Sequence, residues 1–377
     1  MTSLVEEPAM VRTREAGLLE LRQLVVEYGF GEKPVRAVDG VDLAIHEGEI
    51  VGLAGESGCG KTTIANAAMQ ILRPPARIVG GSILFEGENL LGKSAEELRR
   101  FRWRNVSMVL QSAMNALNPV MRVGDQFVDA MRAHERIDRR RALVRAGELL
   151  ELVGIDRRRA RSYPHELSGG MRQRVIIAMA LALQPELIIM DEPTTALDVV
   201  VQREILQQVE ALKRDFGFAV LFITHDLSLL LEFADRIAIM YAGEIVESAS
   251  AERLAANPQH PYTQGLLESF PPLSGPLTRL TGIPGSPPDL RDPPSGCRFH
   301  PRCRYATQVC KEVEPPLVEY GNGHLAACHH PLNVDAAALE AAQVAAETPE
   351  AADEHALPKD TAGESHPVSA EEATPTE

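Results

Sequence analysis

The sequence predicts an α/β fold, with a mostly parallel sheet and a nucleotide site at the carboxyl ends of its strands. Three observations lead to this prediction. Apolar strands alternate with helical stretches, a glycine-rich loop follows the strand at residues 50–53, and Asp191 and Glu192 follow the apolar strand at residues 187–190. Because the carboxyl ends of parallel strands meet on one side of a sheet, the loop and the two acids are expected to share one site.

The glycine-rich loop has the pattern of a phosphate-binding loop. Residues 55–62 read GESGCGKT and fit G-x-x-x-x-G-K-[ST] between a strand and a helix. Glycines let backbone N–H groups approach phosphate oxygens, and the helix start that follows favours an anion. Lys61 is expected to contact the β- and γ-phosphates, and Thr62 to ligate Mg²⁺. A glycine-rich turn with an incidental lysine is the disfavoured alternative. The residues assigned to the triphosphate are Gly55, Ser57, Gly58, Cys59, Gly60, Lys61, Thr62 and Thr63.

Composition and charge exclude several classes of protein. The net charge of the 377 residues is −15, but residues 333–377 contain eleven Asp or Glu and one Lys and so carry −10 of it. The rest of the chain is close to −5, which argues against a broad nucleic-acid surface. No apolar run approaches the ~20 residues of a membrane span, and the acidic N-terminus is not a secretory signal. Five cysteines without such a signal suggest the reducing cytosol.

Two alternating segments precede the phosphate loop. Residues 18–28 and 35–45 alternate apolar and polar side chains, which predicts a small antiparallel sheet against the nucleotide-binding core. Tyr28, at the end of the first segment, is equally well explained as a core residue or as an aromatic that stacks on adenine. After the loop helix, residues 80–90 predict a hairpin strand with its turn at residues 86–88. Residues 1–17 are expected to be a disordered leader.

A charged helical region follows. A strand is expected to end on Gln111, and residues 112–163 show helical periodicity interrupted near Pro119 and Gly154. Interleaved acids favour a solvated helix face over a surface for nucleic acid or anionic lipid. The arginines concerned are Arg132, Arg136, Arg139, Arg140, Arg141, Arg145, Arg157, Arg158, Arg159 and Arg161.

The next segment predicts a second anion-facing helix start. Ser168, Gly169 and Gly170 precede the apolar helix that includes residues 175–183. A chain with one phosphate loop does not need a second phosphate cap for itself. This start is therefore expected to serve the nucleotide of another subunit.

The two acids and a histidine complete the predicted site. A buried strand that delivers Asp191 and Glu192 is typical of a Mg²⁺ ligand beside a base that activates water, and two acids that cap a turn are the alternative. Asp198 lies in the following loop, before a helix at residues 201–215. The strand at residues 218–225, expected to be the last apolar strand, ends on His225. A lone histidine there is more often structural, but this one follows the acids by one helix and one strand.

A proline-rich extension carries four cysteines. Residues 271–294 hold several proline pairs, and the region is expected to be short of helix and packed on the core. Its cysteines have the spacing C-x5-C-x6-C-x17-C, which matches neither ferredoxins nor the short pairs of zinc sites. Spacing alone leaves a four-cysteine metal or cluster site and two disulfides open. Residues 331–377 have a composition that predicts disorder.

The motifs together resemble the ATPase subunit of an ABC transporter. GESGCGKT, Gln111, LSGGMRQR, LIIMDE, ALD and His225 occur in the order and at the spacing of that family, over about residues 18–250. The resemblance implies an ABC-type ATPase core with a small antiparallel β subdomain and a helical subdomain at about residues 112–183. The resemblance implies that Tyr28 stacks on adenine, that Gln111 senses Mg²⁺ and the transmembrane partner, and that Asp191 binds Mg²⁺ through water. It implies that Glu192 polarises the attacking water and that His225 contacts the γ-phosphate. Asp198 would couple the two nucleotide sites of a dimer, and Ser168, Gly169 and Gly170 would complete the site of the opposing subunit.

Further motifs are similar to the oligopeptide/dipeptide importers. These are QSAMNALNPVM after residue 110 and NPQHPYT at residues 257–263. In that group the C-terminal element binds a [4Fe–4S] cluster, which the resemblance assigns to Cys297, Cys303, Cys310 and Cys328. The implied division is an ABC nucleotide-binding domain at residues 18–255, an extension at residues 256–330 and a tail at residues 331–377.

The resemblance implies a function and its partners. The chain would hydrolyse ATP on the cytoplasmic face of the membrane to power import of oligopeptides or dipeptides. Its partners would be a second ATPase subunit, with a heterodimer expected, two transmembrane permease subunits and an extracytoplasmic solute-binding protein, but no nucleic acid. Import of nickel or another small solute is the alternative. A non-transport ABC ATPase is less favoured because residues 61–168 leave room only for a small helical subdomain.

Overall fold

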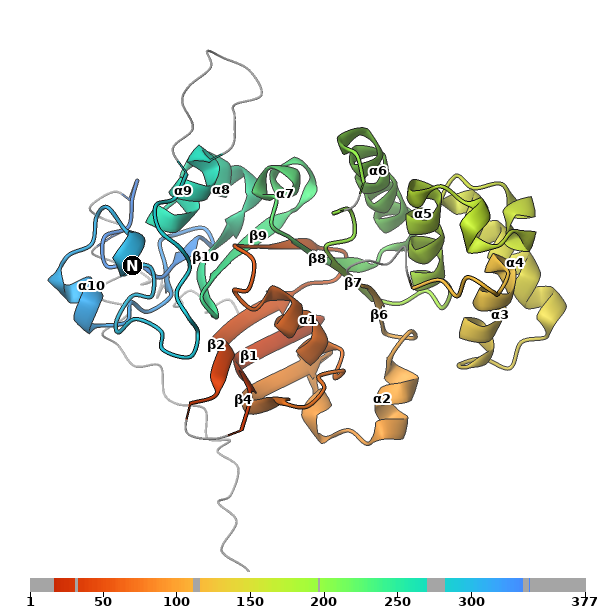
Figure 1. Ribbon diagram of the computed structural model, residues 1–377, viewed down its shortest axis with the longest axis horizontal. Helices are drawn as coiled ribbons and strands as arrows, with labels where there is room; N and C mark the ends of the chain where they lie inside the picture. The colour runs from red at the N-terminus through yellow and green to blue at the C-terminus, as the bar shows by residue number, and fades with distance from the viewer. Residues whose placement is uncertain are drawn as a thin grey trace, which may run out of the picture.

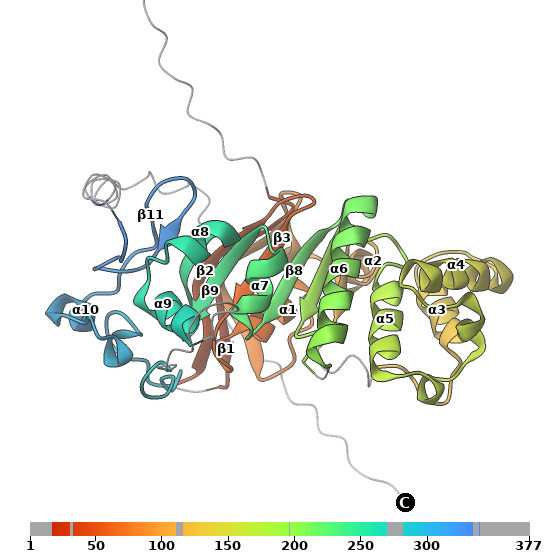
Figure 2. The ribbon, with the colours of Figure 1, turned by 90° about the horizontal axis from the view of Figure 1, so that it is seen from above.

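The computed structural model describes residues 17–30, 33–110, 116–195, 197–269 and 282–334, together with residue 339. A central sheet runs across the molecule, with a smaller sheet against one part of it (Figure 1). A helical lobe lies at one end of the long axis, and the C-terminal extension lies at the other (Figures 1 and 2). The predicted leader at residues 1–17 lies outside the described residues except for residue 17, and the predicted tail at residues 331–377 lies outside them except for residues 331–334 and 339. In the described part of the chain, no helix has the length and apolar character of a membrane span.

The small sheet is antiparallel, as the alternating segments predicted. Its strands lie in the order β2-β1-β4-β5, and β1 pairs with both β2 and β4. The hairpin turn lies at residues 86–87, within the turn predicted at residues 86–88. The bounds are β1 Leu19–Tyr28, β2 Val35–Ile45, β4 Ala76–Phe85 and β5 Glu88–Asn89.

The central sheet has eight strands among the described residues, in the order β11-β12-β10-β9-β3-β8-β7-β6. The five strands from β9 to β6 are parallel, whereas β10, β11 and β12 pair antiparallel. The bounds are β3 Ile50–Ala54, β6 Val106–Val109, β7 Leu187–Asp191, β8 Ala219–Thr224, β9 Arg236–Tyr241, β10 Glu244–Ser250, β11 Val318–Glu319 and β12 Leu325–Ala326. The parallel α/β core is therefore confirmed.

The two faces of the central sheet contribute to two separate hydrophobic cores. One face packs Val51, Leu53 and Ile189 against helix α1 and the small sheet. The other face packs Ile188, Val220 and Phe222 against the helices that follow β6. Side chains alternate between the faces of a strand, so apolar residues at every position are required where both faces are covered. The helices are α1 Lys61–Ala68, α2 Ala95–Phe101, α3 Val123–Arg132, α4 Arg139–Leu152, α5 Gly169–Ala180, α6 Val199–Phe216, α7 Leu227–Phe233, α8 Ala251–Ala256, α9 Pro261–Glu268 and α10 Gln308–Glu312.

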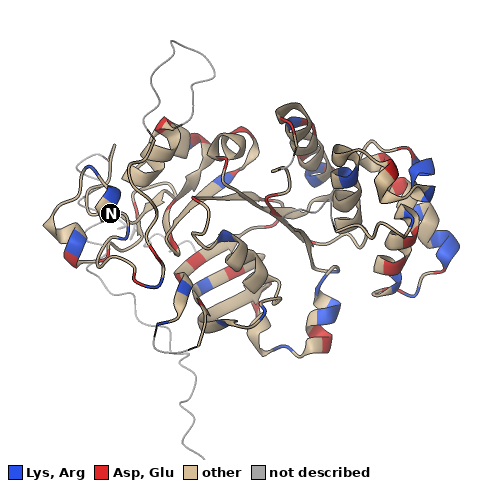
Figure 3. Cartoon of the chain, viewed as in Figure 1, with Lys and Arg blue, Asp and Glu red and all other residues tan. Residues whose placement is uncertain are grey.

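Helices α3, α4 and α5 form the helical lobe, where basic and acidic residues are interspersed along the chain (Figure 3). Of the ten arginines singled out in the sequence, five pair with nearby acids. The pairs are Arg139–Asp125, Arg141–Asp138, Arg145–Glu135, Arg157–Glu151 and Arg158–Asp156. The interleaved acids thus neutralise much of this surface, as expected for a solvated helix face.

One expectation about the C-terminal part is wrong. The strand that ends before His225 is not the last apolar strand, because β9 and β10 follow it and are almost wholly buried. The extension is short of helix and packed on the core, as expected: its described residues form the short helices α9 and α10, and it adds β12 to β10 of the central sheet. The pairing of β12 with β10 joins segments that are distant in sequence, which local periodicity does not reveal.

Candidate functional site

The phosphate loop connects β3 to α1 and depends on glycine at two crowded positions. Gly55 has φ +154° and Gly60 has φ +115°, in the region that side chains disfavour. A Cβ atom on Gly55 would lie 2.1 Å from the carbonyl oxygen of Met240, and one on Gly60 would lie 2.1 Å from that of Ala37. The backbone of the loop therefore packs directly on the neighbouring chain. Ser57 and Gly58 are exposed at the tip of the loop, whereas Cys59 is buried.

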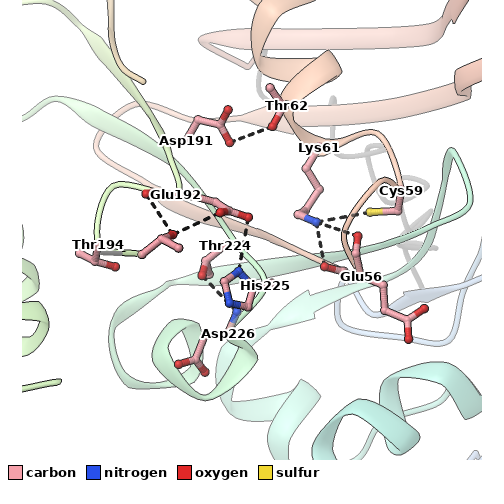
Figure 4. A network of polar contacts seen from close by, with 12 residues as sticks. Glu56, Cys59, Lys61, Thr62, Asp191, Glu192, Thr194, Thr224, His225 and Asp226 are labelled. Atoms are coloured by element: carbon pink, nitrogen blue, oxygen red, sulfur yellow. Dashed lines mark hydrogen bonds and ion pairs between the residues drawn. The ribbon is translucent and has the colours of Figure 1, made fainter. Parts of the chain in front are cut away.

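Lys61 begins α1 and folds back over the loop. Its Nζ donates to the carbonyl oxygens of Gly55 and Glu56, at 2.8 and 3.0 Å, and lies 3.6 Å from the Sγ of Cys59 (Figure 4). The lysine is buried, with 5% of its surface exposed. Its ammonium group is thus held by two carbonyls at the start of the loop, where an incoming phosphate could accept the same protons.

Thr62 and Asp191 meet although 129 positions separate them in the sequence. The Oγ1 of Thr62 donates to Oδ1 of Asp191 at 3.2 Å. Asp191 ends β7 and is 1% exposed. Burial raises the pKa of its carboxyl group, and the hydrogen bond from Thr62 lowers it again in part. A hydroxyl beside a buried carboxyl group matches the oxygen ligands that Mg²⁺ prefers.

Glu192 and His225 lie beside this pair (Figure 4), and Thr195 contacts Glu192 as well. The Nδ1 of His225 lies 3.3 Å from Oε1 of Glu192, and the Oγ1 of Thr195 donates to Oε2 at 3.2 Å. Glu192 itself adopts φ +46°. The strands β7 and β8 end side by side, which brings Glu192 and His225 together as their sequence order suggested. Thr195 was not expected from the sequence, and its only signal is its place three residues after the glutamate.

Of two further residues predicted to contact the nucleotide site, Tyr28 is described by the structure and Gln111 is not. Tyr28 ends β1, and its hydroxyl lies 3.3 Å from the Oγ1 of Thr63 on α1. This contact places the ring next to the phosphate-loop helix. Gln111 lies outside the described residues, two positions after the end of β6.

The second helix start stands apart from the phosphate loop, since α5 and α1 are separate in both views (Figures 1 and 2). Ser168 caps α5, and its hydroxyl accepts from the N–H of Met171 at 3.3 Å. Gly169 and Gly170 form the first turn, and a Cβ atom on Gly170 would lie 2.9 Å from Cγ1 of Val201. Asp198 caps α6 in the same way. The structure therefore brings together the loop, the acids and His225, but not the residues near Ser168.

The four cysteines of the extension line one small cavity of about 10 Å³, together with Phe299 and several histidines. All four are free thiols, so the two-disulfide alternative does not hold in this structure. Burial raises the pKa of Cys297 to about 11 and that of Cys328 to about 12, and the neighbouring cysteines add to both shifts. In the described residues, no three His, Cys, Asp or Glu side chains are grouped as a single metal ion would need.

Comparison with known proteins identifies the family. Residues 38–195 match the model of the ABC transporter family, and residues 246–310 match that of the oligopeptide/dipeptide transporter C-terminal region. A probable peptide ABC transporter ATP-binding protein of Sinorhizobium fredii is 47% identical over 82% of this chain and 94% of its own length. This chain belongs to the oligopeptide/dipeptide group of ABC transporter ATP-binding proteins.

Other relatives within the ABC family agree. The oligopeptide transport ATP-binding protein OppD of Bacillus subtilis is 44% identical over 82% of this chain and 88% of its own length. The dipeptide transport ATP-binding protein DppD of Caldanaerobacter subterraneus is 41% identical over 83% of this chain and 96% of its own length. The dimeric ABC cassette MJ0796 bound to ADP and Pi has a TM-score of 0.55 and 29% identity, and the match covers 62% of this chain and 98% of MJ0796. The chain is accordingly an ABC-type ATPase.

The extension also contacts the ABC cassette at residues that could not be expected from the sequence. Tyr262 accepts a hydrogen bond from the loop residue Glu56, and Arg302 pairs with the carboxylate of the same residue. The motif at residues 257–263 is similar to one in the oligopeptide/dipeptide importers, but nothing in it points to residue 56. These contacts join residues more than 200 positions apart.

Proposed function

We propose that this chain hydrolyses ATP to power the import of oligopeptides or dipeptides through an ABC transporter. The observation that carries the choice of cargo is the match of residues 246–310 to the oligopeptide/dipeptide transporter C-terminal region, next to a complete phosphate loop. The relatives named above have peptide, oligopeptide or dipeptide transport in their names. In this assignment residues 18–255 form the nucleotide-binding domain, and residues 256–330 form the extension.

The proposed hydrolysis assigns a role to each group in the site. Lys61 and the N–H groups of the loop bind the β- and γ-phosphates, and Tyr28 stacks on the adenine. Thr62, Asp191 and Gln111 hold Mg²⁺, which supplies charge stabilisation to the phosphates when bound. Glu192 accepts a proton from the attacking water. His225 contacts the γ-phosphate and, with Thr195, fixes the orientation of the Glu192 carboxylate.

A dimer would complete each site. The start of α5 at Ser168, Gly169 and Gly170 lies apart from the chain's own loop (Figures 1 and 2), and N–H groups at a helix N-terminus bind anions. A second ATPase subunit, identical or related, would place its phosphate loop against this start, and Asp198 would couple the two sites. A heterodimer follows the arrangement implied by the sequence resemblance.

Transport requires further partners at the cytoplasmic face of the membrane. Two permease subunits would provide the path across the bilayer, and the segment near Gln111 would contact them. An extracytoplasmic solute-binding protein would deliver the peptide. Nucleic acid has no part in this proposal.

We further propose that Cys297, Cys303, Cys310 and Cys328 hold a [4Fe–4S] cluster. Four free thiols that converge on one cavity fit the donor set of such a cluster. A cluster spreads its ligands over several irons, so its cysteines stand farther apart than the ligands of a single ion. When bound, the cluster would link segments of the extension. Anaerobically purified protein should contain about four irons per chain and show broad iron–sulfur absorbance. One equivalent of zinc without iron would reject the cluster.

The cargo is tested by uptake of labelled dipeptides and oligopeptides in cells with and without this chain, with labelled nickel as a separate arm. Peptide uptake should disappear without the chain and return with the wild type or with Lys33→Ala, at an exposed lysine, but not with Lys61→Ala. Loss of nickel uptake with unchanged peptide uptake would replace the cargo. If neither uptake changed, the transport proposal would be wrong for these cargoes.

A further inference from the structure

Among the described residues, the hydrogen bonds and the ion pair that join the phosphate loop to the extension all involve Glu56. Arg302 lies in a short 3₁₀ segment at His300–Arg302, between Cys297 and Cys303. Its Nη1 lies 2.6 Å from Oε2 of Glu56, and its Nη2 lies 3.0 Å from Oε1. A guanidinium that meets both carboxylate oxygens fixes the orientation of the carboxylate as well as its charge.

Arg302 is itself held rigidly. Its Nε donates to the carbonyl oxygen of Pro284 at 2.8 Å, and its Nη1 donates to the hydroxyl of Tyr241 at 3.3 Å. The guanidinium carbon lies 5.8 Å from the centre of the Tyr241 ring and 6.0 Å from that of Phe299. Only 8% of the arginine is exposed. Little side-chain entropy therefore remains to be lost when it binds Glu56, unlike in an exposed surface pair.

The extension also holds the backbone of Glu56. The N–H of Glu56 donates to the hydroxyl of Tyr262 at 2.9 Å. Tyr262 lies on α9 and is fully buried. The carbonyl oxygen of the same Glu56 accepts from Lys61. One loop residue thus connects the extension to the lysine that is expected to bind phosphate.

This arrangement also removes an electrostatic penalty. A carboxylate in a loop that surrounds a triphosphate repels the ligand unless a cation neutralises it. No phosphate contact requires an acid at this x position of the motif. Glu56 is therefore explained by its partner Arg302.

We propose that Arg302 and Tyr262 are positioning residues of the nucleotide site, through which the C-terminal extension fixes the phosphate loop at Glu56. Neither residue touches the nucleotide. Arg302 neutralises Glu56 and holds its side chain, and Tyr262 holds its N–H. The extension is thereby part of the ATP site, whichever cargo the transporter carries.

The test is the affinity of the purified full chain for MgATP, measured by calorimetry. Arg302→Met should weaken binding roughly tenfold, because it leaves Glu56 charged and unrestrained beside the phosphates. Arg302→Lys keeps the charge but cannot bind both carboxylate oxygens of Glu56, so its affinity for MgATP should lie between those of the wild type and Arg302→Met. The matched control is Arg304→Met, which also neighbours Cys303 but forms an exposed pair with Glu268. Binding by Arg302→Met equal to that of this control would overturn the proposal.

A double-variant cycle shows whether Arg302 acts through Glu56. Glu56→Gln also breaks the ion pair. The double variant should therefore bind MgATP no more weakly than whichever single variant has the lower affinity. If the losses of affinity of the two single variants multiplied in the double variant, Arg302 would not act through Glu56. In the assembled ATPase, Arg302→Met should raise KM for ATP and keep kcat within about twofold, whereas partial unfolding would lower kcat and leave KM unchanged. Because no cargo enters these measurements, their outcome is independent of the proposed peptide transport.

Discussion

Glu192 shows how a single residue joins backbone strain to chemistry. Its φ of +46° lies in the left-handed region, which costs a residue with a side chain about 1 kcal/mol or more. The residue is nevertheless fixed there: its N–H donates to the carbonyl oxygen of Ile223 at 2.9 Å, and its carboxylate contacts Thr195 and His225. Strain that the surroundings over-determine is typical of functional positions.

The first prediction concerns this carboxylate. Glu192→Gln should retain MgATP binding and trap a closed dimer, while ATP turnover falls by at least about 100-fold, because an amide cannot accept the proton of the attacking water. Turnover and dimerisation are measured by phosphate release and light scattering. The control is Glu186→Gln, at the residue immediately before the start of β7, and it should hydrolyse ATP at the wild-type rate. Undiminished turnover by Glu192→Gln would remove this residue as the base.

The second prediction concerns the packing of the loop. Gly60→Ala would place a Cβ atom 2.1 Å from the carbonyl oxygen of Ala37, so the loop must shift and MgATP affinity should fall by more than roughly tenfold. Gly92→Ala is the control, because a Cβ atom there meets nothing within 4 Å. Equal affinities, measured by calorimetry, would contradict this account of the loop.

At the scale of single residues, the sequence predicts those site residues whose role depends on spacing within a short segment. Lys61 and Thr62 follow from eight consecutive positions, and Asp191 and Glu192 follow from the end of an apolar strand. Thr195 could not be predicted, because its role depends on the path of the chain after Glu192. The distances between the four cysteines were equally inaccessible, since spacing does not describe how the connecting loops fold.

At the scale of elements, one buried carboxylate joins three segments of the C-terminal region. Glu247 on β10 has no exposed surface. It accepts from the N–H groups of Gln259 and His260 at 2.7 and 2.9 Å, and its Oε1 lies 2.7 Å from Nε2 of His324. These contacts connect the central sheet to the start of α9 and to the loop before β12. A buried acceptor with three donors is costly to alter.

The third prediction follows from this network. Glu247→Gln should lower the free energy of unfolding by about 2 kcal/mol, because the amide nitrogen opposes a donor that the carboxylate accepted. Glu252→Gln, at an exposed position of α8, should change it by less than about 0.5 kcal/mol. Urea denaturation measures both. A stability loss no larger than that of the control would contradict the importance of the network.

Most elements of the core could be predicted, because their hydrophobic periodicity is local. The predicted segment at residues 35–45 coincides with β2, and the predicted helix at residues 201–215 lies within α6. β9 and β10 were missed, although Gly243, with φ +94°, marks the turn between them. Strands β11 and β12 have only two residues each, too few for a periodic signal.

At the scale of the whole molecule, the extension closes one end of the central sheet and reaches the phosphate loop as well. Both contacts join residues far apart in the sequence, such as Glu56 and Arg302, 246 positions apart. A single sequence contains no direct record of such pairs. The domain division that the resemblance implied therefore understates how closely the cassette and the extension are connected.

The pairing of β12 with β10 has a consequence for solubility. Ala326 and Leu325 lie opposite Glu247 and Ser248, and the N–H of Ala327 donates to the carbonyl oxygen of Val246 at 2.9 Å. Without this cover, β10 would become an unprotected edge strand, whose free N–H and C=O groups can pair with other chains. A chain that stops after residue 256 should therefore aggregate in light-scattering measurements where the full chain does not. If the shortened chain stayed monodisperse, β10 would not need this cover. Aggregation of the shortened chain would show that the extension prevents β-pairing between molecules.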